Sequence, residues 1–324
     1  MICAIGRGVV MGRNQKHRKM GSAPRNRPPF ETVLLATDFT RGAEWAAERA
    51  ARLPIAAAGK LLVIHVLPQG IPAKYRGQVE REARKALDKI VRRIVRASRR
   101  AGNARLSVVP ALRVGIPYVE IIRLARSEMA DIVVVGRHGR RVLHDLFLGS
   151  TAESVIRKAN LPVLVVNHKP SGSYDRPLIA LDLEDTARSI MEMALRSVGR
   201  NAAEISVLHA YTVPFEGLVM PRLSPRELNA YRSECRNEAL SELQRLLEWA
   251  GDAVRWRASV KRGDPRAAIL REITARRADL AVLGTHGRSG LSHALLGSVA
   301  EHVVRKAVCD VLVAPPARVS FALP

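Results

Sequence analysis

An internal repeat constrains the fold of this chain more than any other feature of its sequence. Ile132–Val166 aligns with Leu280–Ala314 without a gap at a constant offset of 148, and 18 of the 35 positions are identical. Leu35–Asp38 and Ile179–Asp182 match at an offset of 144, so one small insertion separates the early and late parts of the repeat. A chain of 324 residues has room for two ordinary domains, and we therefore expect two tandem copies of one domain.

Short apolar runs alternate with helical patterns in each copy, and few residues are aromatic (4%). We predict strands at Val33–Asp38, Leu61–Val66, Leu106–Arg113, Ile132–Gly136, Val163–Val166, Leu178–Asp182, Glu204–Ala210, Arg255–Val260, Leu280–Gly284 and Val311–Ala314. We predict helices at Arg41–Leu53, Tyr75–Ala101, Tyr118–Met129, Thr151–Ala159, Thr186–Val198, Ser224–Ala250, Arg266–Ala275 and Val299–Ala307. This strict alternation predicts the α/β class: two tandem, doubly wound domains, each with a five-stranded parallel sheet covered by helices on both faces.

The net charge of +23 is uneven along the chain. Residues 1–29 contribute +7, residues 30–169 contribute +13 and residues 170–324 contribute +3. The predicted organisation is a basic disordered tail, a first domain, a linker, a second domain and a C-terminal tail, at 1–29, 30–167, 168–175, 176–315 and 316–324.

The longest apolar runs are far shorter than the roughly 20 residues that cross a bilayer, so we expect no membrane span. The three cysteines, at unrelated spacings and without a CxxC pair, indicate neither a disulfide framework nor a zinc site. Arg7 interrupts the short apolar stretch near the start, which argues against a secretory signal. These features favour a cytoplasmic protein.

The loop after the fourth strand of each copy has a composition suited to phosphate. The spacing Gly-x2-Gly-x9-Gly-Ser occurs at Gly136, Gly139, Gly149 and Ser150, and again at Gly284, Gly287, Gly297 and Ser298. Glycines let the backbone approach an anion, and the start of a helix offers N–H groups and the positive end of its dipole. Ligands of open parallel sheets bind at this end of the strands.

This spacing, an Asp at the end of the first strand and a Gly-x-Pro turn after the third together resemble the universal stress protein family, in its ATP-binding branch. The resemblance covers both copies. It implies that Asp38 and Asp182 face adenine and ribose, with the backbone of Val66 and Ala210 closing on the base. It further implies that ribose and phosphates are lined by Val135, Gly136, Gly139, Leu283, Gly284 and Gly287, and that the outer phosphates, normally with Mg²⁺, are held by Gly149, Ser150, Thr151, Gly297, Ser298 and Val299.

The resemblance also implies that the last strands of the two copies pair, giving a pseudo-two-fold pair of domains within one chain. A further homodimer stays open. The first copy is favoured as the nucleotide site, because the second has Glu184 and Asp185 in the loop after its first strand.

Some of these residues also have a simpler structural interpretation. Asp38 and Asp182 have the residue type that caps a following helix. His138 and His286 lie in the glycine loops without a partner carboxylate set by spacing, which favours a structural or phosphate-contacting role over that of a general base.

The long helix of the first copy has a basic ridge. Between Lys74 and Arg100 it carries 11 basic and three acidic residues, whereas its counterpart in the second copy is balanced. A solvated face is the usual meaning of such a run, but nucleic acid or another anionic surface is an alternative partner.

The sequence thus predicts a protein that binds ATP, ADP or AMP, acts as a regulatory or stress-adaptation module, and is not an enzyme beyond slow ATP hydrolysis. One alternative is a basic interaction protein without nucleotide that docks on nucleic acid or a protein. The other is an ATP-using enzyme on the same fold, although the first strand ends in Thr37-Asp38-Phe39 and not in a Ser-Gly-Gly loop.

Overall fold

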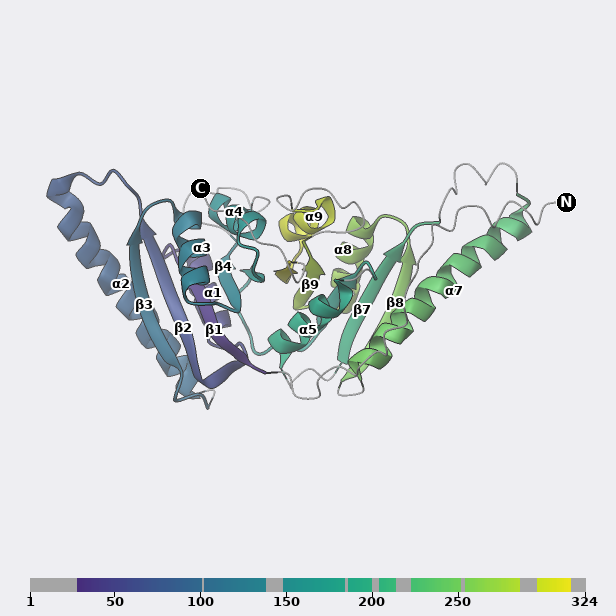
Figure 1. The fold of residues 1–324 in the computed structure, drawn as a ribbon, viewed down its shortest axis with the longest axis horizontal. Helices are drawn as coiled ribbons and strands as arrows, with labels where there is room; N and C mark the ends of the chain where they lie inside the picture. The colour runs from purple at the N-terminus through teal and green to yellow at the C-terminus, as the bar shows by residue number, and fades with distance from the viewer. Residues whose placement is uncertain are drawn as a thin grey trace.

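The computed structural model describes residues 28–100, 102–137, 148–183, 186–199, 204–213, 223–251, 254–285 and 296–315. The first copy consists of β1 (Phe30–Ala36), α1 (Arg41–Ala50), β2 (Ile55–Leu67), α2 (Ala73–Arg100), β3 (Ser107–Val114), α3 (Pro117–Ser127), β4 (Ile132–Gly136), α4 (Ser150–Lys158) and β5 (Val163–Val166). The second consists of β6 (Pro177–Leu181), α5 (Ala187–Val198), β7 (Glu204–Tyr211), α7 (Pro225–Ala250), β8 (Arg255–Arg262), α8 (Pro265–Arg276), β9 (Leu280–Gly284), α9 (Ser298–Lys306) and β10 (Asp310–Ala314) (Figure 1). Every predicted strand and helix is present.

The strands of both copies form one ten-stranded sheet in the order β3-β2-β1-β4-β5-β10-β9-β6-β7-β8. All neighbours within a copy are parallel. In the first copy the strand order reverses between β1 and β4, and in the second between β6 and β9. Each copy is therefore a doubly wound α/β domain with its own switch point, as predicted.

The two copies are joined by their last strands. β5 and β10 pair antiparallel, with Val165 opposite Val311 and Val163 opposite Val313. This pairing confirms the expected intramolecular pair and covers two strands whose residues are all apolar except Asp310 at the start of β10. An exposed apolar edge of this kind would otherwise be a template for association.

A buried polar cluster reinforces this joint. Asp310 accepts hydrogen bonds from Arg49 Nε (3.0 Å), Tyr174 Oη (2.8 Å) and the Asn167 backbone N–H (2.9 Å). Arg49 stacks on Tyr174 and also donates to the carbonyl of Gly172. Burial raises the pKa of Asp310, and the Arg49 guanidinium acts in the opposite direction. The cluster ties α1 and the predicted linker to the start of β10.

Two hydrophobic clusters fill the space between the sheet and its helices. One contains residues of α1, α2, α5 and α7, and the other contains residues of α3, α4, α8 and α9. Each cluster includes side chains from both copies, so the apolar core continues across the joint on both faces of the sheet.

β2 begins six residues earlier than its apolar run predicts. Its first residues, from Ile55 to Lys60, pair with β1 through an irregularity, since Ile55 lies opposite Phe30 and Lys60 opposite Thr32. A Cβ on Gly59 would lie 2.9 Å from the carbonyl oxygen of Ala56 and 3.0 Å from that of Glu31. The bulge therefore requires glycine at this position.

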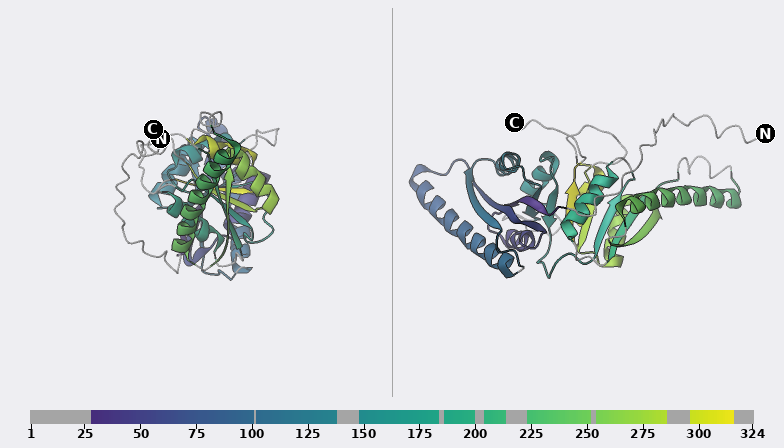
Figure 2. Two further views of the ribbon diagram at one scale, coloured as in Figure 1. Left: turned by 90° about the vertical axis from the view of Figure 1, so that its right-hand side faces the viewer. Right: turned by 60° about the horizontal axis from the view of Figure 1, so that its bottom comes forward.

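The long helices α2 and α7 lie along the two outer flanks of the molecule (Figure 2). α7 begins with the predicted capping box: Ser224 Oγ accepts from the backbone N–H of Glu227, and the Glu227 carboxylate accepts from the backbone N–H of Ser224. Within the described part of the chain, no helix is both long and apolar enough to cross a membrane.

Candidate functional site

The predicted site residues of the second copy surround one cavity. It has a volume of about 330 Å³ and opens at the carboxyl ends of β6, β7 and β9. The predicted residues that line it are Asp182, Ala210, Leu283, Gly284, Gly297, Ser298 and Val299. The eighth, Gly287, lies outside the described residues. Leu181, Ile190, Leu208 and Ile269 add an apolar wall that the prediction did not include.

The first copy places its predicted residues on equivalent elements. Asp38 follows β1, Val66 is near the end of β2, Val135 and Gly136 end β4, and α4 begins at Ser150 and Thr151. β1 neighbours both β2 and β4 in the sheet, so these positions lie at the switch point. Gly139 and His138 fall outside the part of the chain that the structure describes, as does His286 in the second copy.

The turn after the first strand has the same unusual backbone in both copies. Phe39 (φ 64°) and Leu183 (φ 60°) directly follow the two aspartates, and both adopt the left-handed conformation that residues with a Cβ rarely take. Such residues concentrate at functional sites, where the surrounding structure holds them. The repeat therefore preserves a strained turn beside each predicted aspartate.

Neither aspartate is the N-cap of the helix that follows. Thr40 is the N-cap of α1, and Thr186 is the N-cap of α5. Asp38 instead holds Thr40, because its Oδ1 accepts from the Thr40 backbone N–H (3.1 Å) and hydroxyl (2.5 Å). Asp38 therefore does not cap α1 itself, but it positions Thr40, which does.

A pair of histidines was not among the predicted site residues. His65 Nδ1 lies 2.8 Å from the carbonyl oxygen of Thr37, and His209 Nδ1 lies 2.8 Å from that of Leu181. Because a carbonyl oxygen only accepts, Nδ1 donates in both rings. These bonds fix the end of β2 or β7 to the residue before each aspartate. The signal was present in the sequence, since the two histidines have the same offset of 144 as the aspartates.

The glycines that precede α4 and α9 close the loops by backbone hydrogen bonds. The N–H of Gly149 donates to the carbonyl of Arg137 (2.8 Å), and the N–H of Gly297 donates to that of Thr285 (2.7 Å). Each glycine is the N-cap of its helix and provides no side-chain cap. The N–H groups that remain for a ligand are therefore those of the first helical turn, which begins at Ser150 or Ser298.

Gly136 has a packing role in addition to its predicted place at the ligand. A Cβ at this position would lie 2.7 Å from the carbonyl carbon of Gly42 and 3.0 Å from the backbone nitrogen of Ala43. The end of β4 and the first turn of α1 therefore approach each other backbone to backbone. Substitution here would disturb the fold before it reported on any ligand.

One residue differs between the loops with a clear structural effect. Arg137 extends from the end of β4 across the domain joint, where its guanidinium donates to the carbonyls of Arg305 and Ala307 at the end of α9. The corresponding residue of the second copy is Thr285, which is buried and too short for such a contact. The first loop is thereby linked to the helix whose N-terminus lines the second cavity.

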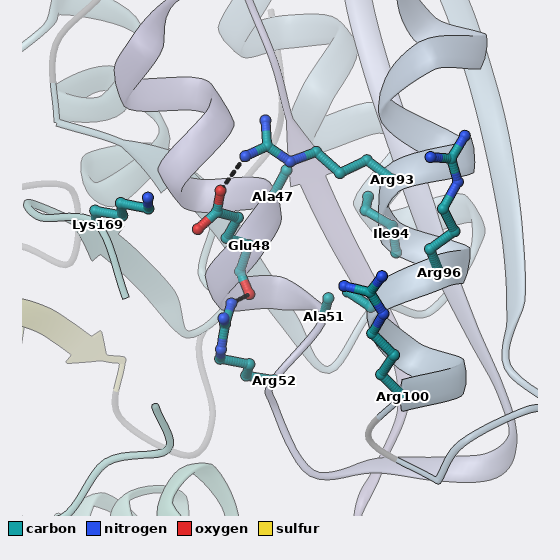
Figure 3. Close-up of a pocket in the computed structure, with 10 residues that line it drawn as sticks. Ala47, Glu48, Ala51, Arg52, Arg93, Ile94, Arg96, Arg100 and Lys169 are labelled. Carbon is teal, nitrogen blue, oxygen red and sulfur yellow. Dashed lines mark hydrogen bonds and ion pairs between the residues drawn. The ribbon is translucent and has the colours of Figure 1, made fainter. Parts of the chain in front are cut away.

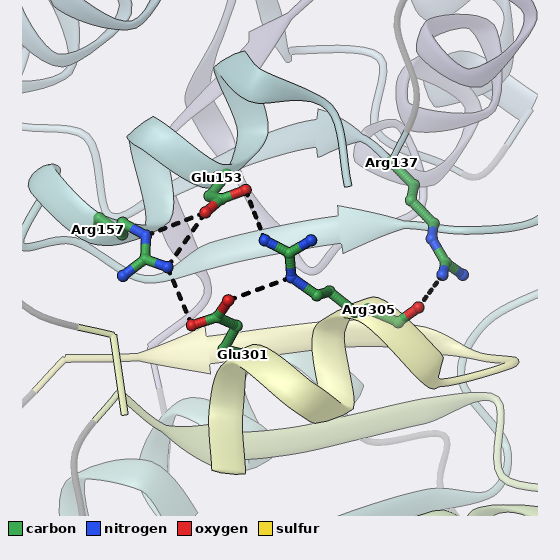
Figure 4. Close-up of polar contacts among 5 residues, drawn as sticks. All are labelled: Arg137, Glu153, Arg157, Glu301 and Arg305. Atoms are coloured by element: carbon green, nitrogen blue, oxygen red, sulfur yellow. Dashed lines mark hydrogen bonds and ion pairs between the residues drawn. The ribbon is translucent and has the colours of Figure 1, made fainter. Parts of the chain in front are cut away.

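α4 and α9 also face each other through a closed ring of charges (Figure 4). Glu153 pairs with Arg157 and Arg305, and Glu301 pairs with the same two arginines, at distances of 3.0 to 3.3 Å. Each residue of one helix has its counterpart in the other at an offset of 148. The two helices that begin at the candidate sites thus form a nearly symmetric contact at the joint.

The described residues contain no group of three or more His, Cys, Asp or Glu side chains arranged to hold a metal ion. The cavity of the second copy resembles a small-molecule pocket in two respects: its volume lies within the range of such pockets, and its walls are largely apolar.

Comparison with known proteins identifies the family. The family model described as "Universal stress protein family" matches residues 29–167 and again residues 173–315. The chain belongs to the universal stress protein family. It is a tandem member with two universal stress protein domains, which confirms the resemblance noted in the sequence.

Relatives of this universal stress protein agree with that assignment. Universal stress protein Rv2005c of Mycobacterium tuberculosis is 29% identical over 271 residues, which cover 78% of this chain and 86% of that protein. Universal stress protein MJ0577 of Methanocaldococcus jannaschii is 28% identical over 158 residues, 44% of this chain and 98% of that protein. A universal stress protein structure from Archaeoglobus fulgidus matches with a TM-score of 0.61 at 20% identity, covering 88% of this chain and 98% of that one, and so shares the fold.

Proposed function

We propose that this universal stress protein binds an adenine nucleotide, with ATP as the first candidate, in one or both domains, and acts as a regulatory module of stress adaptation. The observation that carries the proposal is the cavity of the second domain. All the described residues that were predicted from the sequence as its nucleotide contacts line this one space. Family membership supports the same site.

In this proposal each part of the second site has a distinct task. The apolar wall with Leu208 and Ile269 holds the base, and Asp182 accepts hydrogen bonds from the ribose hydroxyls. The N–H groups of Ser298 and Val299 face the phosphates, and the positive end of the α9 dipole stabilises their charge. Bound Mg²⁺ would neutralise part of the phosphate charge.

We also propose that hydrolysis is slow at most. Among the described residues that line the second cavity, the titratable ones are Asp182 and His209. His209 is almost completely buried and directs Nδ1 to the carbonyl of Leu181. No recognisable hydrolase motif places either residue to activate water.

A charge placed at the helix start tests the proposal without loss of the fold. A glutamate as the first residue of a helix interacts favourably with the helix dipole, but its carboxylate repels a phosphate bound there. Ser298→Glu therefore blocks the second site, and Ser150→Glu is the matched change in the first. The measurement is the amount of nucleotide released by denaturation and identified by chromatography, per chain.

We expect near-stoichiometric adenine nucleotide in the native chain, a loss of the nucleotide of one domain in each single variant, and none in the double variant. Circular dichroism verifies that the variants are folded. A chain that holds no nucleotide even after incubation with ATP and magnesium would contradict the proposal and favour the basic interaction protein. Rapid consumption of ATP would favour the enzyme.

A further inference from the structure

A basic cavity lies in the first domain, between α1 and α2. It is separate from the candidate nucleotide sites. Its volume is about 400 Å³, and its floor consists of Ala47, Ala51, Ile94 and Ala97. Five cationic residues and one acidic residue complete the lining: Arg52, Arg93, Arg96, Arg100, Lys169 and Glu48 (Figure 3). They come from the ends of α1 and α2 and from the linker, so three segments bring positive charge to one space.

Only part of this charge is neutralised within the protein. Arg93 pairs with Glu48, and with Glu44 at 3.5 Å. Arg52 donates to the backbone carbonyl of Glu48 (2.8 Å), which carries no net charge. Arg96, Arg100 and Lys169 form no ion pair with any described residue. The lining therefore keeps a formal charge of +4, from five cations and one carboxylate.

The second domain shows that the fold does not require such a cavity. The burial patterns of α1 and α5 match at the offset of 144, which places Met191 and Leu195 where the first domain has Ala47 and Ala51. In the last two turns of α7, Leu246 and Trp249 are buried, and Arg188 stacks on the Trp249 ring. Large apolar side chains thus fill the space between these helices, whereas alanines and arginines leave it open in the first domain.

We propose that this cavity of the first domain binds a small molecule that carries two or more phosphate groups. Guanidinium groups form paired hydrogen bonds with phosphate oxygens, and several of them around one space match several phosphates better than a single anion. The apolar floor accommodates the carbon body of such a ligand, and the volume suits a small molecule. The proposal does not depend on the nucleotide site at the other end of the strands.

Two simpler roles of these arginines lead to different predictions. Basic residues in the last turn of a helix stabilise it through the dipole, which accounts for Arg99 as well as for Arg100. The basic ridge of α2 attracts any polyanion, RNA included, by charge alone. In both roles, arginines inside and outside the cavity contribute alike. A phosphate site in the cavity instead requires that the arginines lining the cavity contribute more to binding than those outside it.

The test therefore compares two variants of the full-length chain with equal charge. Arg96→Gln with Arg100→Gln changes the lining, whereas Arg92→Gln with Arg99→Gln changes exposed residues of the same helix that lie outside it. Both carry Ser150→Glu and Ser298→Glu, so that phosphate cannot bind at the nucleotide sites. Binding of inorganic tripolyphosphate, and in a second series of inositol hexakisphosphate, is measured by calorimetry at physiological salt.

We expect one ligand per chain, about tenfold weaker binding in the cavity variant and less than a twofold change in the matched variant. Arg100→Trp, which puts an indole ring in place of the guanidinium, gives the same loss by filling the space. Binding of the inositol compound alone shows that the ligand needs a carbon body, and binding of both shows that the phosphates suffice. Equal weakening in both variants, or no binding of either probe, overturns the proposal.

Discussion

The two candidate nucleotide sites have the same backbone and different surroundings. Phe39 and Leu183 share the left-handed conformation, and the histidine and glycine hydrogen bonds recur with nearly equal lengths. Beside this common backbone, Ile190 adds an apolar wall in the second domain, where the first has the smaller Ala46. The difference teaches that the repeat preserves the backbone geometry of the site, whereas the side chains around it have diverged between the domains.

The helix pairs α1–α2 and α5–α7 differ more strongly between the two domains. The first domain leaves a basic cavity between α1 and α2, whereas the second packs Met191 and Trp249 between α5 and α7. The first domain thus has an additional charged cavity between its helices, whereas the second has apolar packing at the equivalent place. We expect the two domains to differ also at the joint, in the loops and at the long helices.

The largest effect is expected at Asp310, which stands where the first copy has Pro162. Asp310→Asn leaves Arg49 buried without a counter-charge, and we expect a loss of about 3 kcal/mol in the free energy of unfolding. Urea unfolding followed by circular dichroism measures the change. In the double variant Asp310→Asn with Arg49→Met, the arginine is replaced by the residue type of Met193, which occupies the equivalent position of the second copy. Its free energy of unfolding should fall less than that of Asp310→Asn alone. A larger loss would contradict the role of the ion pair.

A smaller effect is expected at Arg137, where the two loops diverge. Arg137→Thr introduces the residue of the second domain and removes two hydrogen bonds to the end of α9. Because charged donors stabilise helix ends, we expect the free energy of unfolding to fall by about 1–2 kcal/mol. Thermal unfolding measures it, with Arg137→Lys as a control that keeps the charge and should give an intermediate value. An unchanged melting temperature would show that the hydrogen bonds from Arg137 to the end of α9 do not stabilise the fold.

The smallest effect concerns the start of α7, where the second domain has a capping box. Ser224→Ala should cost about 1 kcal/mol at neutral pH. The hydrogen bonds from Ser224 lower the pKa of Glu227, so the part of this contribution that the Glu227 carboxylate makes is present above the ordinary pKa of glutamate and is lost as the pH falls through the lowered value. The bond from the Glu227 backbone N–H to Ser224 Oγ does not titrate, so the melting curves of the two proteins should lie closer together at acidic than at neutral pH without coinciding. A constant difference would contradict the coupling.

Most of the fold could be predicted from the sequence because the repeat supplied two versions of each element. The alternation of strands and helices and the doubly wound class follow from patterns that occur twice, whereas the pairing of β5 with β10 was expected from the resemblance to the family. The early start of β2 was missed, since Ala56–Ala58 and Gly59 carry no strand pattern and are held by pairing with β1. Local sequence does not encode such tertiary pairing.

The candidate site was predictable to the extent that it repeats. The aspartates, glycines and helix starts of the second domain were identified and line one cavity. The contacts of Arg49 with Asp310 and of Arg137 with Ala307 join residues 261 and 170 positions apart and occur once each. No spacing rule connects such pairs, and they depend on how the two domains meet. The basic character of α2 was visible in the sequence, but the cavity beside it required the packing of α1 and the linker.

The antiparallel contact of β5 with β10 has a further consequence for the behaviour of the protein in the cell. Because both strands belong to one chain, each meets its partner at an effective concentration set by the tether and not by the amount of protein present. Dilution therefore does not separate the domains, as it would separate two chains joined through the same strands. Changes in expression level then alter the number of paired domains without altering the fraction that is paired.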